Sequence, residues 1–229
     1  MHPTIQSRLR DVKRRIAAAE QQYGRTAGSV MLLAVSKDKS VQQIREAYDT
    51  GQRRFGESYI QEALTKIEAL SDLDIEWHFI GPVQSNKTKH IARHFAWVHS
   101  VDRVKIAQRL HDQRPLSSPP LNICLQINIS HERSKQGIDL NELAMLAREI
   151  KAFDRLRVRG LMAIPAPTDN FQEQRHMFMQ IRQAQQQLIT DGWQLDTLSM
   201  GMSNDMEAAI AEGATMVRIG TAIFGERSI

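Results

Sequence analysis

The chain has 229 residues, of which 41% are hydrophobic and 24% charged, values that are ordinary for a soluble globular protein. No apolar run approaches the roughly 20 residues that a membrane span needs, and the N-terminal segment lacks the apolar core of a secretory signal. The net charge of +4 is spread along the chain, and the basic clusters hold few aromatic residues, so the composition does not favour nucleic-acid binding.

The rest of the pattern alternates short apolar runs with longer helical stretches. The runs predict eight strands, at Val30–Ser36, Arg53–Gly56, Ile75–Gly81, Trp97–Ser100, Leu121–Ile129, Val158–Ile164, Thr197–Met200 and Met216–Ile219. Helices are expected between them, near 40–50, 58–70, 85–95, 102–113, 139–153, 170–191 and 204–212. Strands that are apolar on both faces and separated by helices indicate a parallel α/β sheet. Eight of them favour a closed (β/α)8 barrel of the TIM type over an open doubly wound sheet, since no G-x-G-x-x-G follows the first strand.

In such a barrel, the N-terminal segment can cover the place that the short C-terminal segment leaves open. Only "GTAIFGERSI" follows the last predicted strand, which leaves no room for a full eighth helix. Near the N-terminus, apolar residues recur at steps of four, three and four and define one helix face, at Ile5, Leu9, Val12 and Ile16. We therefore expect an additional N-terminal helix to cover the vacant sector, and a single domain over residues 1–229.

The chain contains one cysteine, Cys124, which cannot form an intramolecular disulfide. It lies within the apolar run "LNICLQINI", so we interpret it as a small core residue and not as a nucleophile. A chain without disulfides is typical of a reducing compartment, and we expect a cytoplasmic protein.

Functional residues of a barrel lie at the carboxyl ends of its strands. The seventh predicted strand ends in "SMGMSND", a glycine-containing turn that runs into a helix, which Ser203 or Asn204 is expected to cap. The eighth is followed by Gly220 and Thr221, which offer a close backbone approach and a hydroxyl. Ordinary turn chemistry explains either loop alone, but the two together favour a phosphate site.

Two polar residues lie within predicted strands. Alternation along "MVRIG" places Arg218 on the face of Met216, and since both faces of a barrel strand are buried, this cation needs an acceptor or a ligand. A structural ion pair with a neighbouring strand is the alternative. For His78, in "EWHFIG", the local pattern favours a hydrogen-bonded core histidine over a base.

Lys37 follows the apolar run of the first strand, in "VMLLAVSKDKS". A low-dielectric barrel mouth near a second cation favours the neutral amine, which attacks a carbonyl to form a Schiff base. A solvated cap of the strand is the alternative. With a phosphate site, such a lysine points either to pyridoxal 5′-phosphate or to an aldolase acting on a sugar phosphate, and the local pattern does not separate these two.

Several long motifs in order resemble the pyridoxal phosphate homeostasis protein family (the proline-synthase co-transcribed group). They are "LLAVSKDKS", "RRFGESYIQEA", "WHFIGPVQSNKTK", "VHSVDR", "INISHERSKQG", "GLMAIP", "LSMGMSNDMEAAI" and "VRIGTAIFGER". The resemblance covers about residues 5–227. It implies a fold similar to the N-terminal barrel of bacterial alanine racemase, without its β domain.

The resemblance also implies a cofactor, pyridoxal 5′-phosphate, and a role in its intracellular homeostasis. Lys37 would form the internal aldimine, and Arg218 would face the pyridine nitrogen. The phosphate would be held by Ser203, Gly220 and Thr221, and the ring pocket would be lined by Ser58, His78 and Met200. The family usually has asparagine where this chain has Ser58, so the contact of this residue with the ring is expected to be lost or water-mediated.

We expect binding without robust catalysis, and assign no catalytic residue and no metal site. A guanidinium at the ring nitrogen disfavours a protonated pyridinium, which weakens the electron sink. Racemisation also needs a second acid–base group, which alanine racemases take from a tyrosine of their β domain; here the tyrosines are Tyr23, Tyr48 and Tyr59, and no pattern makes one of them that group. The alternatives are a small amino-acid racemase and a Schiff-base aldolase on a sugar phosphate.

Partners follow from this reading. A carrier would transfer the cofactor by transient contact with apo-enzymes, with Lys39 or Lys135 as candidate intermediate acceptors. Both lysines also fit solvated loop positions. We expect a monomer that binds neither nucleic acid nor membrane.

Overall fold

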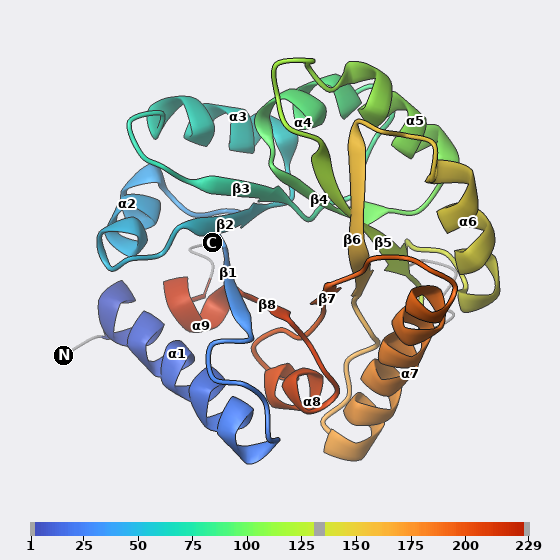
Figure 1. The fold of residues 1–229 in the computed structure, drawn as a ribbon. Coiled ribbons are helices and arrows are strands. Elements are labelled where there is room, and N and C mark those ends of the chain that lie inside the picture. The colour runs from blue at the N-terminus through green and yellow to red at the C-terminus, as the bar shows by residue number, and fades with distance from the viewer. Residues whose placement is uncertain (1–2, 131–135, 227–229) are drawn as a thin grey trace.

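The apolar runs of the sequence become the strands of a closed barrel (Figure 1). The structure, a computed structural model, describes residues 3–130 and 136–226. Eight parallel strands pair in chain order and β8 closes on β1. They are β1 (Met31–Val35), β2 (Arg54–Glu57), β3 (Glu76–Phe79), β4 (Trp97–Val101), β5 (Leu121–Ile127), β6 (Leu156–Ala163), β7 (Thr197–Ser199) and β8 (Met216–Ile219). The predicted fold class is confirmed.

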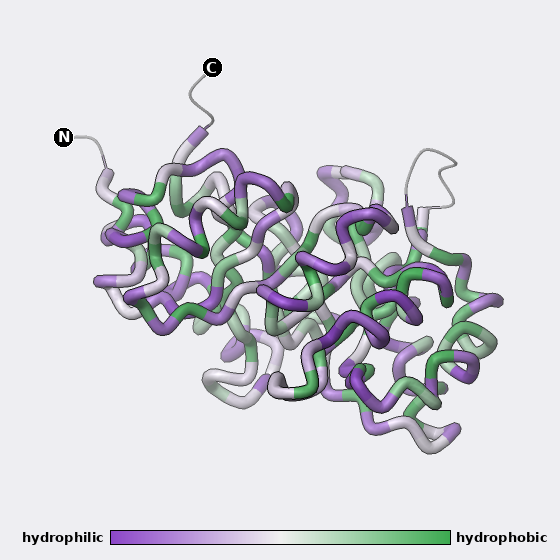
Figure 2. Tube along the Cα trace, turned by 90° about the horizontal axis from the view of Figure 1, so that it is seen from above, coloured by the Kyte–Doolittle hydropathy of each residue, from purple (hydrophilic) through white to green (hydrophobic). Residues whose placement is uncertain are grey.

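Helices form a ring outside the strands (Figure 1). They are α1 (Ile5–Gln22), α2 (Val41–Asp49), α3 (Ile60–Ala69), α4 (Thr88–His94), α5 (Val104–Gln113), α6 (Leu143–Ile150), α7 (Phe171–Thr190), α8 (Met206–Ala211) and α9 (Thr221–Phe224), with a 3-10 turn η1 (Leu140–Glu142) before α6. Along these helices hydrophilic and hydrophobic residues alternate (Figure 2), as expected where one face packs on a sheet. Within residues 3–130 and 136–226, no helix combines the length and apolarity that crossing a bilayer requires.

The helix α1 covers the sector that lacks a full eighth helix, as the sequence predicts. Between β8 and Glu226, the last described residue, the chain forms the single helical turn α9, and α1 packs against both α8 and α9 (Figure 1). Its buried face includes Ile5, Leu9, Val12 and Ile16. At its C-terminal end the buried carboxylate of Glu20 accepts a hydrogen bond of 2.7 Å from the backbone N–H of Val30, which fixes the entry into β1.

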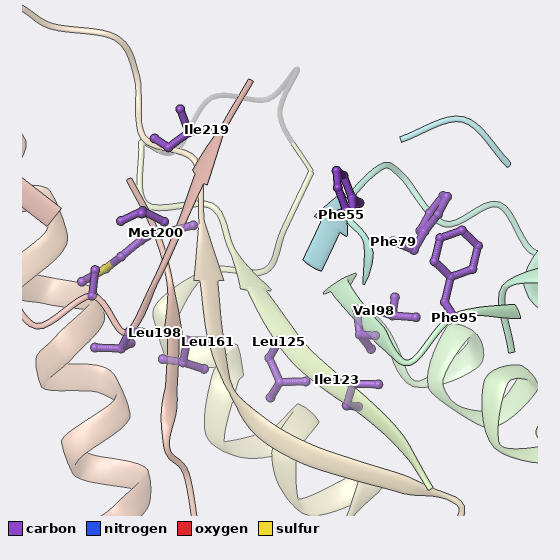
Figure 3. Packing of buried hydrophobic residues seen from close by; sticks show 14 of the residues in the cluster. Phe55, Phe79, Phe95, Val98, Ile123, Leu125, Leu161, Leu198, Met200 and Ile219 are labelled. Atoms are coloured by element: carbon purple, nitrogen blue, oxygen red, sulfur yellow. The ribbon is translucent and has the colours of Figure 1, made fainter. Parts of the chain in front are cut away.

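The main hydrophobic core lies between the strands and the helices, and we call it the shell. Phe55, Phe79 and Phe95 are among its buried aromatic residues (Figure 3). The rings of Phe79 and Phe95 meet edge to face with centroids 5.4 Å apart. Tight packing of such rings makes the shell the main source of stability.

The inside of the barrel is a separate and smaller cluster, which includes Trp97, Cys124 and Met162. Cys124 alternates along β5 with the shell residues Ile123 and Leu125, and its side chain is fully buried. Burial raises the pKa of the Cys124 thiol to about 12, so it stays protonated. The interpretation as a core residue is confirmed.

Candidate ligand-binding site at the barrel mouth

Lys37 directly follows β1 and is placed by the residue before it. The backbone N–H of Ser36 donates to the carbonyl of Gly56 at 3.0 Å, and the Ser36 hydroxyl donates to Glu57 Oε1 at 2.6 Å. The carbonyl of Ser36 in turn accepts from Lys66 Nζ at 2.7 Å. Ser36 is fully buried, whereas Lys37 is partly exposed, so a rigid strand end places Lys37 at the mouth of the barrel.

A buried ion pair stands behind this strand end. Lys66 Nζ lies 2.9 Å from Glu57 Oε1, with the two side chains 6% and 0% exposed. Burial raises the pKa of Glu57, and the charge of Lys66 opposes that rise only in part. Such a pair adds little net stability because both charges lose their hydration. Its contribution here is to fix the backbone next to Lys37.

The chain turns sharply after Lys37. Asp38 has a positive φ of 61°, and its backbone N–H donates to Glu62 Oε1 at 2.7 Å. Lys39 Nζ donates to the carbonyls of Gly225 and Glu226, both at 3.0 Å, and so ties this loop to the C-terminal segment. Lys135, the other lysine considered for transfer, lies outside the described residues.

The loop after β7 differs in one detail from the sequence-based expectation. The residue that precedes α8 at its N-cap is Asp205, so the expectation that Ser203 or Asn204 caps this helix is wrong. The Asp205 carboxylate accepts from the backbone N–H of Met202 at 2.5 Å, and this closes a turn that keeps Ser203 and Asn204 out of the helix. Gly201 starts the turn with a φ of 94°, where a Cβ atom would lie 2.6 Å from Ala209 Cβ.

This turn and the loop after β8 leave backbone donors unused. Within the described part of the chain, the N–H groups of Ser203, Asn204, Thr221 and Ala222 donate to no protein acceptor. The two loops are neighbours, because the backbone N–H of Arg218 donates to the carbonyl of Gly201 at 2.9 Å. All four residues are partly or fully exposed, so a ligand can reach them from solvent. Unused N–H groups in two adjacent loops suit a phosphate.

Arg218 lies inside the barrel below these loops and is 4% exposed. Its Nη1 donates to the carbonyl and the hydroxyl of Ser199, the latter at 2.8 Å, and its Nη2 donates to the carbonyl of Ala163 at 2.9 Å. The predicted acceptors therefore exist, as neutral groups of β6 and β7; within the described residues no salt bridge involves Arg218. Burial lowers the pKa of Arg218 to about 10, against the opposing charge of Asp205, so it is still a cation at neutral pH.

Three further side chains were expected around the ring. His78 is fully buried, and its ring nitrogens lie 2.9 Å from His99 Nε2 and 2.9 Å from Glu76 Oε1, so it is a hydrogen-bonded core histidine. Met200 is fully buried in the shell, in the same cluster as Leu198 and Ile219 (Figure 3). Ser58 is partly exposed at the end of β2.

The residues that sequence reasoning missed are those that support the site. Glu57 and Lys66 form the buried pair behind Lys37, and Ser199 and His99 connect Arg218 with His78. A signal for His99 exists in "WVHSV", where it shares a strand face with the apolar residues Trp97 and Val101. Nothing in the sequence reveals that Lys66, on a helix, reaches the carbonyl of Ser36.

The chain is similar to known proteins over nearly its whole length. Residues 8–228 match the family model of the alanine racemase N-terminal domain. A protein of Pseudomonas aeruginosa named pyridoxal phosphate homeostasis protein is 55% identical, over 98% of this chain and 96% of that protein. The protein of the same name from Escherichia coli K12 is 53% identical, over 97% of both chains.

Solved structures agree. PipY of Synechococcus elongatus, determined with PLP bound, is 38% identical with a TM-score of 0.80, over 92% of this chain and 100% of that one. A Bifidobacterium adolescentis protein described as unknown is 34% identical with a TM-score of 0.88, over 96% of this chain and 94% of that one. Alanine racemase from Corynebacterium glutamicum, 17% identical with a TM-score of 0.70 over 94% of this chain and 61% of that one, shares the fold.

Proposed function

The chain belongs to the pyridoxal phosphate homeostasis protein family, and from this premise we propose that it binds pyridoxal 5′-phosphate and contributes to the intracellular homeostasis of this cofactor. The observation that carries the proposal is the amine of Lys37 at a fixed strand end, in the same barrel mouth as two loops with unused backbone N–H groups. An aldehyde and a phosphate on one small molecule match this pair of features.

Each group of the mouth suits one part of the cofactor. Ser203, Gly220 and Thr221 belong to the loops whose N–H groups and hydroxyls suit the phosphate. Arg218, a buried donor without any acceptor atom in its side chain, suits the pyridine nitrogen. When bound, the cofactor supplies an aldehyde that forms a Schiff base with an amine. Lys37 is the amine we assign to it.

We further propose that binding proceeds without robust catalysis. Arg218 remains a cation at neutral pH and does not donate its proton to the ring nitrogen, so the ring is a poor electron sink. Of the tyrosines, Tyr48 stacks under the guanidinium of Arg53 at 3.7 Å and Tyr23 ends α1, which leaves Tyr59, 52% exposed, at the strand end of β2. Nothing in the described residues holds Tyr59 as an acid–base group. A monomeric cytoplasmic carrier that meets apo-enzymes at its mouth fits these features.

Absorption spectroscopy of the purified full chain tests the proposal. Adding pyridoxal 5′-phosphate should produce the absorbance of a protein-bound Schiff base. Lys37→Ala should abolish that absorbance and weaken binding at least about tenfold, since a covalent bond is lost. Lys39→Ala is the matched control, because its ammonium is held by the carbonyls of Gly225 and Glu226, and it should keep the absorbance. A wild-type chain that stays colourless, or a Lys37→Ala variant with unchanged absorbance, overturns the proposal.

The two alternative activities have separate readouts. A racemase would remove the optical rotation of alanine or serine, in a Lys37-dependent manner and well above the rate with free cofactor. An aldolase would leave a sugar-phosphate fragment on the lysine after borohydride reduction, and not a pyridoxyl group. We expect neither result.

A further inference from the structure

A continuous hydrogen-bond chain crosses the inside of the barrel, and we call it the interior chain. From Arg218 Nη1 it passes to Ser199 Oγ (2.8 Å), from there to His99 Nδ1 (2.8 Å), then from His99 Nε2 to His78 Nδ1 (2.9 Å) and from His78 Nε2 to Glu76 Oε1 (2.9 Å). Its members are Arg218, Ser199, His99, His78 and Glu76. They come from β8, β7, β4 and β3, so the chain links opposite sides of the barrel.

Every hydrogen bond of the interior chain has its donor on the side of Arg218 and its acceptor on the side of Glu76. Arg218 has only donors, so the Ser199 hydroxyl accepts from it and gives its own proton to His99 Nδ1. His99 then carries its proton on Nε2 and donates to His78 Nδ1. His78 likewise carries its proton on Nε2 and donates to the carboxylate of Glu76. One arrangement of protons satisfies every member, with both imidazoles neutral.

The surrounding charges hold this arrangement. Burial lowers the pKa of His99 well below its ordinary value, and the nearby His78 and Arg218 add to the shift. Burial also lowers the pKa of His78, although Glu76 opposes it, while Arg54 acts in the same direction as burial. The hydrogen bond from His78 lowers the pKa of Glu76, which is paired with Arg54 at 3.0 Å. A cation at one end and an anion at the other thus flank two neutral histidines.

We propose that Ser199, His99, His78 and Glu76 are positioning residues for Arg218, which hold its guanidinium in one orientation toward a heteroaromatic nitrogen bound at the mouth. This inference rests on the proposed function, since that function supplies the nitrogen. The interior chain and the carbonyl of Ala163 occupy Nη1 and one N–H of Nη2, which leaves the second N–H of Nη2 and the N–H of Nε for a ligand.

The need for such a chain follows from the flexibility of arginine. Its side chain has many rotamers, and burial of a guanidinium is favourable only when its donors are satisfied. Ser199 alone presents a hydroxyl that rotates freely, but a hydroxyl that must donate to His99 has its lone pairs directed at Arg218. The hydrogen bonds from His99 to His78 and from His78 to Glu76 extend this constraint to Glu76, whose backbone is fixed in β3.

A pair of substitutions at His99 tests the inference. His99→Leu cuts the interior chain. His99→Gln keeps an acceptor and a donor at a spacing similar to that of the two ring nitrogens and can bridge Ser199 and His78. We expect His99→Leu to weaken cofactor binding about tenfold and to alter the pH dependence of the Schiff-base absorbance, and His99→Gln to stay within about threefold of wild type. Met162→Leu, also inside the barrel but outside the interior chain, is the matched control and should bind as wild type.

A second readout needs no cofactor. Histidine ring nitrogen-15 NMR of the ligand-free full chain should show His78 and His99 as neutral Nε2–H tautomers. A folded His99→Leu variant that binds as tightly as wild type, equal weakening by Leu and Gln, or Nδ1–H tautomers in the wild type would each overturn the inference. The failure of the proposed function looks different: the wild-type chain itself would then form no Schiff base.

Discussion

The inside of the barrel and the shell around it are built from opposite kinds of residue. The shell packs rings such as Phe79 and Phe95 between strands and helices, whereas the inside carries the interior chain from Glu76 to Arg218 (Figure 3 shows the shell). Apolar burial is non-directional and yields most of the stability. Buried hydrogen bonds add about 1 kcal/mol each, yet leaving one unmade costs about 1–3 kcal/mol. The shell therefore stabilises the barrel, and the inside specifies one arrangement of groups.

The largest effect is expected from the shell. Phe95 is 2% exposed, and Phe95→Ala should lower the free energy of unfolding by about 3–5 kcal/mol through the cavity it leaves. Urea denaturation measures this loss. The molecules that remain folded should bind pyridoxal 5′-phosphate with unchanged affinity, since the ring of Phe95 packs against Phe79 in the shell. Equal stability would contradict the role of the shell, and weaker binding by the folded fraction would contradict its separation from the site.

The next effect concerns the pair behind Lys37. Lys66→Met leaves the carboxylate of Glu57 buried without its cation and should cost about 3–5 kcal/mol of stability. The double variant Lys66→Met/Glu57→Leu removes both charges and should recover most of that loss. Denaturation of the two variants and wild type measures the coupling. Equal stability of the single and double variants would show that the pair is not coupled.

The cost of Lys66→Met should also depend on pH. Burial raises the pKa of Glu57, so the folded chain keeps a proton on this carboxyl where the unfolded chain has lost it. Stability from this group therefore falls as pH rises above its ordinary value of 4.5. Without Lys66 the shift is larger, so the variant should be closer to wild type at pH 5 than at pH 8.

The smallest expected effect is the contribution of His99 to the pH dependence of stability. Its lowered pKa means that, below its ordinary value of 6.5, the unfolded chain binds a proton that the folded chain does not. Stability therefore falls with falling pH, by up to about 1.4 kcal/mol per pH unit for this residue. Over one unit below pH 6.5, the stability of His99→Gln should therefore fall by up to that amount less than the stability of wild type. Glu57 and Asp205 have raised pKa values, which change stability in the opposite direction, but both residues are present in the two proteins and their effects cancel in the comparison. Parallel stability curves would contradict the buried neutral state of His99.

The fold was predictable because its signals are local. Apolar runs and helical periodicity lie within single segments, so they placed every strand of the barrel, including β8 at Met216–Ile219. The covering helix α1 followed from its apolar face. The cap of α8 was misplaced because Asp205 bonds back to Met202, which a linear pattern of capping residues does not reveal.

The geometry of the candidate site was predictable in part. The end of each strand is local, so Lys37, Arg218 and the two loops could be found in the sequence. Their support comes from contacts between distant residues: Lys66 reaches Ser36, and His99 reaches Ser199, one hundred residues away in the chain. Such contacts leave no periodic trace in one sequence. Met200 is a different case, because its expected place at the ring came from the family resemblance alone, and its side chain is buried in the shell.

The most direct test of the central claim is to locate the lysine that bonds to the cofactor. The full chain is saturated with pyridoxal 5′-phosphate, reduced with borohydride and digested, and the modified peptide is identified by mass spectrometry. We predict a pyridoxyl group on Lys37, the lysine that β1 and the Glu57–Lys66 pair hold at the mouth. A pyridoxyl group mainly on another lysine, or none at all, would contradict the assignment.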